Sequence, residues 1–225
     1  MDWKKILSVI LIMLVLNACA GIGIFSSAHN EFELGLDLFK LGKYEEAITH
    51  FNKSAELDPM FGRPYIYLGR SYLNLMRWTE AIQPLRTALR LSPEETKHEI
   101  VNIMIDALLG AAISDFREGN FRSSIDSLKE ALKLKPESVK LINELIDTLI
   151  ANGRDLLSRG NTIEAIKSFN EAIELSPNSI NAYLGLAKAY FQEDDILKAL
   201  SAAGKAMGID PSNRDAQFLL NQLMK

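Results

Sequence analysis

The sequence predicts an all-α solenoid of five consecutive helix pairs followed by one closing helix. Five prolines recur along the chain at similar intervals: Pro59, Pro93, Pro136, Pro177 and Pro211. A small residue stands twelve positions before each of them: Ala47, Ala81, Ser124, Ala165 and Ala199. Two series that share one set of spacings indicate a structural repeat, in which each helix pair buries its apolar face against its neighbours.

The composition excludes several classes of protein. Of the 225 residues, 48% are hydrophobic and 24% are charged, an ordinary globular balance, and the formal net charge is −4. Such a chain lacks the basic field that phosphate backbones require, so we expect no nucleic-acid partner. The single cysteine, Cys19, allows neither a disulfide within the chain nor a multi-cysteine metal site.

The N-terminal residues are predicted to direct export from a bacterial cytoplasm. Lys4 and Lys5 precede an apolar run from residue 6 to residue 16, which is the layout of a secretory signal. The next residues, Leu16-Asn17-Ala18-Cys19, resemble the lipobox of bacterial lipoproteins, in which the cysteine is acylated and the chain is cut before it. Residues 1–18 would then be a signal peptide, and residues 19–30 a lipidated cysteine with a short tether. The Ala20 that follows implies the outer membrane by the sorting rule of such lipoproteins.

Two alternatives for this leader remain open. Ala18-Cys19-Ala20 also fits an ordinary A-x-A cleavage site, which would leave a soluble periplasmic protein. The apolar stretch from Ile6 to Phe25 is twenty residues long, enough to remain in the inner membrane as an uncleaved signal anchor. Under all three interpretations the two lysines hold the N-terminus inside, so the rest of the chain lies outside the cytoplasm.

The repeat domain is predicted over residues 31–225, and each repeat is a helix, a tight turn and a second helix. The repeats fall at about 28–61, 62–95, 96–138, 139–179 and 180–213, with a capping helix over 213–224. Glycines at three of the turns, Gly42, Gly119 and Gly160, are suited to the left-handed conformation that ends a helix. Pro84 lies inside the second helix of repeat two, where it removes a hydrogen bond.

Repeats three and four are longer than the others in their first helix. The segment from the preceding proline to the small residue covers 93–124 in repeat three and 136–165 in repeat four, against 59–81 in repeat two. The excess of about two helical turns predicts one helix of about 25 residues from Pro93 to Glu118 and a similar one from Glu137 to Ser158. Two interpretations stay open: a local thickening of the core, or a protruding ledge that forms a dimer contact and makes the protein a homo-oligomer.

The motif Tyr65-x-x-Leu68-Gly69-x-x-Tyr72 places its four residues on one helical face. Followed by Ala81 and Pro93, it closely resembles the tetratricopeptide repeat, whose pattern is W-x₂-L-G-x₂-Y…A-x₃-F…P with a period of about 34 residues. The resemblance covers about residues 28–213 and implies a right-handed superhelix with a concave groove lined by the first helix of each pair. It is weakest in the first helix of repeat three, where small or polar residues replace bulky ones: Ala111, Ala112 and Asp115.

By the geometry of that family, a partner would bind to first-helix residues that face away from the second helix. The residues predicted to line the groove are Phe32, Leu36, Phe39, Arg63, Ile66, Arg70, Leu73, Leu109, Ile113, Phe116, Ile150, Arg154, Leu157, Leu184, Lys188 and Phe191. Four of them are cationic although the chain is acidic, which favours a partner segment with apolar anchors and acidic flanks. The other interpretation is that several of these residues pack inside a tight superhelix.

No catalytic constellation is found in the sequence. The three histidines, His29, His50 and His98, share no i, i+4 spacing, and there is no P-loop and no G-x-S-x-G motif. We therefore expect no enzyme, no cofactor and no metal site.

These observations predict a membrane-anchored interaction scaffold, or assembly adaptor, of the bacterial cell envelope. Such a protein would resemble the repeat-containing pilotins of type IV pili and secretins and the lipoprotein of the outer-membrane barrel assembly machine. Its partner would be a protein of an envelope assembly or secretion machine. The alternatives are an adaptor for a periplasmic protease or peptidoglycan hydrolase and a self-assembling structural protein.

Overall fold

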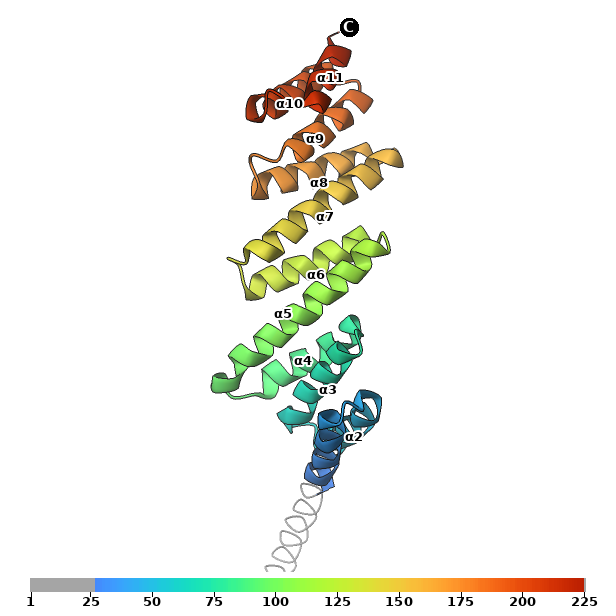
Figure 1. Cartoon of the computed structure of the whole chain (residues 1–225), viewed down its shortest axis with the longest axis vertical. Helices are drawn as coiled ribbons and strands as arrows, with labels where there is room; N and C mark the ends of the chain where they lie inside the picture. Colours follow the sequence, from blue (N-terminus) through green and yellow to red (C-terminus); the bar gives the residue numbers. More distant parts are fainter. Residues whose placement is uncertain (1–26, 225) are drawn as a thin grey trace, which may run out of the picture. The chain divides into compact units, whose positions relative to one another are not determined.

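The computed structural model of the protein describes residues 27–224, and every regular element in that range is a helix. A first helix, described over residues 27–40, precedes ten others (Figure 1). These are α2 (Tyr44–Leu57), α3 (Gly62–Asn74), α4 (Trp78–Leu91), α5 (Glu94–Arg117), α6 (Phe121–Leu134), α7 (Val139–Ser158), α8 (Thr162–Leu175), α9 (Ile180–Gln192), α10 (Ile196–Ile209) and α11 (Arg214–Leu223). The predicted all-α fold of helix pairs is confirmed.

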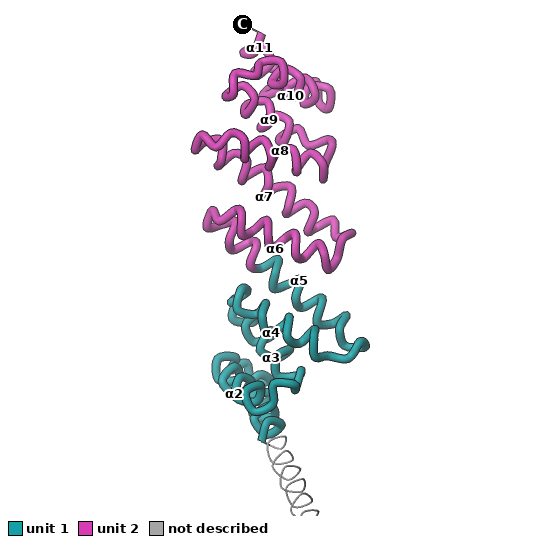
Figure 2. The backbone as a smooth tube through the Cα atoms, turned by 180° about the vertical axis from the view of Figure 1, so that it is seen from behind, with its two compact units in different colours: residues 1–110 teal, residues 111–225 magenta. Residues whose placement is uncertain are grey.

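The chain divides into two compact units, unit 1 over residues 1–110 and unit 2 over residues 111–225, and the division falls inside α5 (Figure 2). The predicted signal peptide and Cys19 lie outside the described residues. Residues 27–30, which were assigned to the tether, already belong to the first helix. Ala28 in this stretch is buried, and its carbonyl accepts a hydrogen bond of 2.7 Å from Ser54 Oγ on α2.

The core of unit 1 is aromatic. The Phe32 ring lies 5.8 Å from the Phe51 ring, 5.3 Å from the Phe61 ring and 5.6 Å from the Tyr67 ring, measured between centroids. The contacts of Phe32 with Phe61 and Tyr67 are edge-to-face, and such contacts add to the free energy gained by burying the rings. The first helix can approach α2 this closely because Gly35 faces Phe51, where a Cβ atom would lie 2.7 Å from Phe51 Cδ1.

Small residues are packed between the helices in the C-terminal part of unit 2. Phe169 on α8 fills the space left by two glycines, since a Cβ atom on Gly153 or Gly185 would lie within 2.7 Å of its ring. In the next pair, α9 and α10 contact each other through fully buried alanines: Ala182, Ala187, Ala189, Ala199, Ala203 and Ala206. Alanine is the strongest helix former, so this pair combines close helix packing with high intrinsic helicity.

The turns inside the helix pairs share one backbone conformation. Gly42, Gly119 and Gly160 have φ of 74°, 79° and 78°, as predicted from the glycines. Met76 and Asp194 occupy the same turn position with φ of 57° and 61°. Each of these five residues stands seventeen positions before one of the five recurring prolines. The left-handed residue is therefore part of the repeat, and two of the repeats fill it without glycine.

The long helices of repeats three and four are confirmed, with small shifts at their starts. The third repeat begins with α5, of 24 residues, and the fourth with α7, of 20 residues. Pro93 precedes α5, and its carbonyl accepts from the Thr96 N–H at 3.1 Å. The start of α7 is set by Ser138, whose Oγ accepts from the Leu141 N–H at 3.5 Å. Pro84 lies inside α4, as expected.

Candidate partner-binding face

Six of the predicted groove residues of unit 2 fall into two columns that cross successive first helices. Ile113, Arg154 and Lys188 stand at equal distances before the prolines of their repeats, so they hold one repeat position on α5, α7 and α9. Phe116, Leu157 and Phe191 hold the position three residues further on. The α7 and α9 members of the two columns form one surface, because these helices contact each other and positions three apart share a helix face. Ile113 and Phe116 of α5 adjoin α7, since they line one cavity with Glu144 and Thr148. These six residues are called the first-helix face below.

The apolar column of this face is partly exposed. Phe116 is 38% exposed and Phe191 is 40% exposed, and Leu157 is half-buried between them in the series. Phe116 is held in place by an edge-to-face contact with Phe121 on α6, with ring centroids 5.5 Å apart. Large aromatic side chains that stay half in water are the residues most often found as binding anchors.

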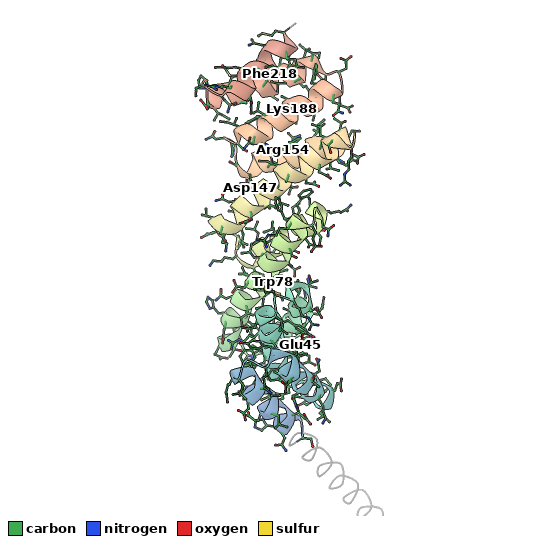
Figure 3. The ribbon with its side chains drawn as sticks, turned by 45° about the vertical axis from the view of Figure 1, so that its right-hand side comes forward. Glu45, Trp78, Asp147, Arg154, Lys188 and Phe218 are labelled. Carbon is green, nitrogen blue, oxygen red and sulfur yellow. The ribbon has the colours of Figure 1, made fainter. Side chains whose placement is uncertain are left out.

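The cations of the first-helix face have no carboxylate partner among residues 27–224. Arg154 Nη2 donates to the amide oxygen Oδ1 of Asn181 at 3.3 Å, which leaves its charge uncompensated. Lys188 on α9 is exposed and forms no ion pair within the described chain. Figure 3 shows Arg154, Lys188 and Phe218 following one another along α7, α9 and α11.

A third column of predicted groove residues is buried, which agrees with the other interpretation, that several of these residues pack inside the superhelix. Phe32, Leu109, Ile150 and Leu184 are each at most 7% exposed. They hold one repeat position, together with the half-buried Ile66. In unit 1 the Phe32 ring packs against Tyr67 of α3, and in unit 2 Leu184 lies on α9, which contacts both α7 and α11. This position therefore turns toward the neighbouring pair, not toward a partner.

The predicted groove residues of unit 1 are engaged within that unit. Leu36 and Phe39 pack on the aromatic core cluster. The guanidinium of Arg63 lies 4.5 Å from the centroid of the Phe32 ring. Arg70 lies 5.4 Å from the Tyr67 ring and forms an ion pair with Glu99. Leu73 is half-buried. These cations already have ring or carboxylate partners. Unit 1 therefore has less positive charge available to an acidic segment than unit 2 has.

A cavity of about 150 Å³ lies beside the first-helix face, between α6, α7 and the last turns of α5. It is lined by Ala112, Ile113, Phe116, Arg117, Ser124, Leu128, Glu144 and Thr148. Two of these, Ile113 and Phe116, also belong to the face. The small residues of repeat three are visible in the sequence, but helical spacing alone does not indicate a cavity there, and Glu144 and Thr148 are not among the predicted groove residues.

Phe218 is not among the predicted groove residues, although the spacing of the repeats identifies it. It follows Leu184 at the same interval that separates Pro177 from Pro211, so it continues the third column on α11. No further helix pair follows in the described chain, and Phe218 is 72% exposed where its repeat equivalents are covered.

Neither metal-binding nor membrane-spanning features are found in residues 27–224. In that range no three His, Cys, Asp or Glu side chains are grouped so that they could hold a metal ion. Nor is any helix described there both long and apolar enough to cross a bilayer.

Family models of the tetratricopeptide repeat match residues 32–96 and 180–213, and a TPR repeat model matches residues 153–194. Sperm-associated antigen 1 of Rattus norvegicus is 27% identical over 111 residues, which are 49% of this chain and 11% of that protein. BBSome complex member BBS4 of Bos taurus is 27% identical over 115 residues, 51% of this chain and 20% of that protein. The chain thus spans a fifth or less of the length of these relatives.

Among solved structures, a TPR repeats protein from Bacteroides fragilis superposes with a TM-score of 0.59 at 14% identity, over 88% of this chain and 97% of that one. The fold is therefore shared beyond the residues that the repeat models match. Stacked repeats of this kind use their extended surfaces to bind other proteins and are generally not enzymes. The repeat motifs, the helix pairs and these matches together show that the chain belongs to the tetratricopeptide-repeat proteins.

Proposed function

We propose that this protein is an interaction scaffold that holds an acidic, partly apolar segment of another protein on the first-helix face of unit 2. The observation that carries the proposal is the combination on one face of two uncompensated cations, Arg154 and Lys188, with the exposed rings of Phe116 and Phe191. In a chain of net charge −4, a cationic strip selects against most of the protein's own surface and favours a carboxylate-bearing partner.

The two kinds of residue would contribute in different ways. Exposed charges mainly speed association and orient the partner, and their contribution falls as salt screens them. Half-buried aromatic rings supply most of the affinity when a partner covers them. The proposed complex should therefore form faster at low ionic strength and dissociate faster when a ring is truncated.

We further propose that the scaffold acts at the bacterial cell envelope, attached to the membrane by an acylated Cys19. This part is supported by the lysines, apolar run and lipobox-like residues of the leader. A scaffold with a fixed membrane attachment would serve an assembly or secretion machine by holding one of its proteins close to the bilayer.

Mass spectrometry of the N-terminal peptide tests the attachment. The full chain and a Cys19→Ser variant are expressed with the leader in a bacterium and recovered from the membrane fraction. A diacyl or triacyl mass on Cys19, absent from the variant, is expected. A free N-terminus after residue 18 or later, or an uncleaved leader, would end the lipoprotein proposal and leave the binding proposal untouched.

Crosslinked affinity capture from the cells that encode the protein tests the binding face. The Arg154→Glu/Lys188→Glu double variant is compared with the wild type and with Lys205→Glu, an exposed cation on α10 outside the face. We expect the captured partner to fall about tenfold or more with the double variant and to remain with the control. Equal recovery by a double variant with an unchanged circular dichroism spectrum would exclude this face as the binding site.

A further inference from the structure

The cavity beside the first-helix face lies in repeat three, whose first helix departs most from the repeat pattern. Counted back from the proline of each repeat, the positions of Ala111 and Asp115 correspond to Leu68 and Tyr72 in repeat two. Leu68 is buried in unit 1, and Tyr72 packs on the core there. Repeat three lacks both large side chains, and Asp115 instead accepts a hydrogen bond of 2.6 Å from Ser123 Oγ. The cavity of about 150 Å³ lies between α5, α6 and α7, and its α5 wall consists of the neighbouring residues Ala112, Ile113, Phe116 and Arg117.

The lining of this cavity is suited to an apolar group. Ile113, Phe116 and Leu128 supply its walls. The two hydroxyls of the lining are bonded within the protein, since Ser124 Oγ donates to the Ala112 carbonyl at 2.8 Å and Thr148 Oγ1 to the Glu144 carbonyl at 2.7 Å. A water molecule would therefore find few partners there, and apolar cavities of about this size take up groups as large as benzene.

Two charged residues belong to the lining of the cavity, Arg117 and Glu144. Arg117 is exposed and Glu144 is half-buried, so neither needs a partner inside. Both charged groups can therefore stay hydrated while the apolar side chains of the lining contact a bound group, which suits a pocket for a single apolar side chain.

The repeat sets the distance between this cavity and the cations. Ile113 in the cavity wall, Arg154 and Lys188 hold the same repeat position on three successive first helices. Axes of packed helices lie about 8–10 Å apart, and an extended chain advances about 3.3 Å per residue. A segment that crosses the helices in extended form therefore meets the next position after about three residues and the one beyond after about six.

We propose that the cavity receives one leucine- or methionine-sized side chain of an extended partner segment, with acidic residues about three and six positions away that meet Arg154 and Lys188. This inference rests on the proposed function, because it specifies the sequence of the segment that the first-helix face binds. The apolar side chain fixes the register of the segment, and the two carboxylates fix its direction across the helices.

Selection from a displayed library of random peptides tests the inference. Peptides of about ten residues are long enough to cross three neighbouring helices. The library is applied to the full chain and to Thr148→Met, whose longer side chain fills the cavity. The matched control is Thr148→Ser, which keeps the hydroxyl and leaves the cavity open. Thermal melting followed by circular dichroism establishes that each variant is folded, and Ile113→Trp replaces Thr148→Met if that variant does not fold.

The wild type and Thr148→Ser should enrich peptides with one large apolar residue separated by about three and six positions from two acidic ones. With Thr148→Met the apolar preference should disappear while the acidic preference remains, and peptides selected on the wild type should bind about tenfold more weakly or worse.

Two further outcomes separate the pocket from the function it rests on. Enrichment of acidic peptides without an apolar position, or an apolar preference that survives Thr148→Met, would overturn the pocket and leave the proposed binding face intact. If no peptide binds the wild type better than Arg154→Glu/Lys188→Glu, the proposed function itself is wrong.

Discussion

Two helix pairs of this protein fill the space between their helices with residues of different size. In the first pair of unit 1, Gly35 on the first helix faces Phe51 on α2, and both are buried. In the last pair of unit 2 the same repeat positions, counted back from the proline, carry Ala187 and Ala203, and both are fully buried. A glycine with a phenylalanine and an alanine with an alanine are alternative ways to fill the space between two closely packed helices.

The difference reaches the surface. In unit 1 three arginines lie over aromatic rings: Arg63 is 4.5 Å from the Phe32 ring, Arg70 is 5.4 Å from the Tyr67 ring and Arg77 is 4.9 Å from the Tyr72 ring. In unit 2 the alanine-rich pair also places one cation near a ring, Lys198 at 5.3 Å from Tyr190, whereas Arg154 and Lys188 have neither a ring nor a carboxylate partner among the described residues. The position of a cation relative to neighbouring rings and carboxylates therefore decides whether its charge is available to a partner.

Truncation of the large residue should have the greatest effect on stability. Phe51→Ala is expected to lower the free energy of unfolding of unit 1 by about 3–5 kcal/mol, because it empties the centre of the aromatic core. The matched change in the other pair, Ala203→Gly, should cost about 1 kcal/mol, mainly through helix propensity.

Hydrogen exchange with mass spectrometry shows which residues lose stability. We expect Phe51→Ala to raise the exchange rate mainly in residues 27–110. A smaller loss from Phe51→Ala than from Ala203→Gly would contradict the view that unit 1 depends on its aromatic core.

Two glycine-to-alanine substitutions in unit 2 should change the free energy of unfolding in opposite directions. Gly185→Ala places a Cβ atom 2.3 Å from Phe169 Cε1, so it should destabilise by about 1–3 kcal/mol through overpacking. Gly204→Ala on the neighbouring α10 meets no atom within 4 Å and should stabilise by up to about 1 kcal/mol.

Urea denaturation measures both changes. Adding Phe169→Leu to Gly185→Ala should recover part of the loss, since the two residues are in contact and their effects are not additive. A loss from Gly204→Ala as large as that from Gly185→Ala would show that the open space at Gly204 is absent in solution.

The sequence predicted the helix pairs well because prolines and small residues are local features that recur with the repeat. The long helices of repeats three and four followed from the same counting. The candidate site was harder, because helical spacing shows which residues share a face but not which neighbour that face meets. Leu184 and Lys188 are four residues apart on α9, yet one packs between helix pairs and the other is exposed. Only the placement of the next first helix separates them.

The turns give a second example. Glycine is the usual sign of a left-handed residue, and it correctly predicts Gly42, Gly119 and Gly160. It does not predict Met76 and Asp194, which have the same conformation. Counting the distance from Gly42 to its proline back from the other prolines identifies both residues. A tertiary repeat can impose a backbone conformation that the local residue disfavours.

This conformation predicts a moderate gain from the reverse substitution. Met76 is 73% exposed and holds φ at 57°, so Met76→Gly removes backbone strain and loses little packing. We expect stabilisation by about 1 kcal/mol, measured as a higher urea midpoint. Gly42→Ala, at the same turn position with φ of 74°, should move the midpoint in the opposite direction. An unchanged midpoint for both variants would mean that these turns carry no strain in solution.

The smallest expected effect concerns the attachment of the first helix to α2. Glu31 accepts from His50 Nδ1 at 2.8 Å and pairs with Lys53. The hydrogen bond from Lys53, and then that from His50, hold the pKa of the Glu31 carboxyl below its usual value of 4.5. A carboxyl with a lowered pKa in the folded state stabilises the fold at pH values above the usual one, and this stabilisation is lost as pH falls through the folded pKa.

Replacing this carboxylate should therefore matter only where it is ionised. Glu31→Gln should lower stability at about pH 7 by less than about 1 kcal/mol, and the difference from the wild type should be smaller at about pH 3, because it decreases as pH falls through the lowered pKa of the Glu31 carboxyl. Glu46→Gln, which removes an exposed charge paired with Lys43 within one turn, controls for net charge. Thermal melts at both pH values measure the difference, and a gap between the wild type and Glu31→Gln that persists undiminished at low pH would show that Glu31 acts there through packing and not through its charge.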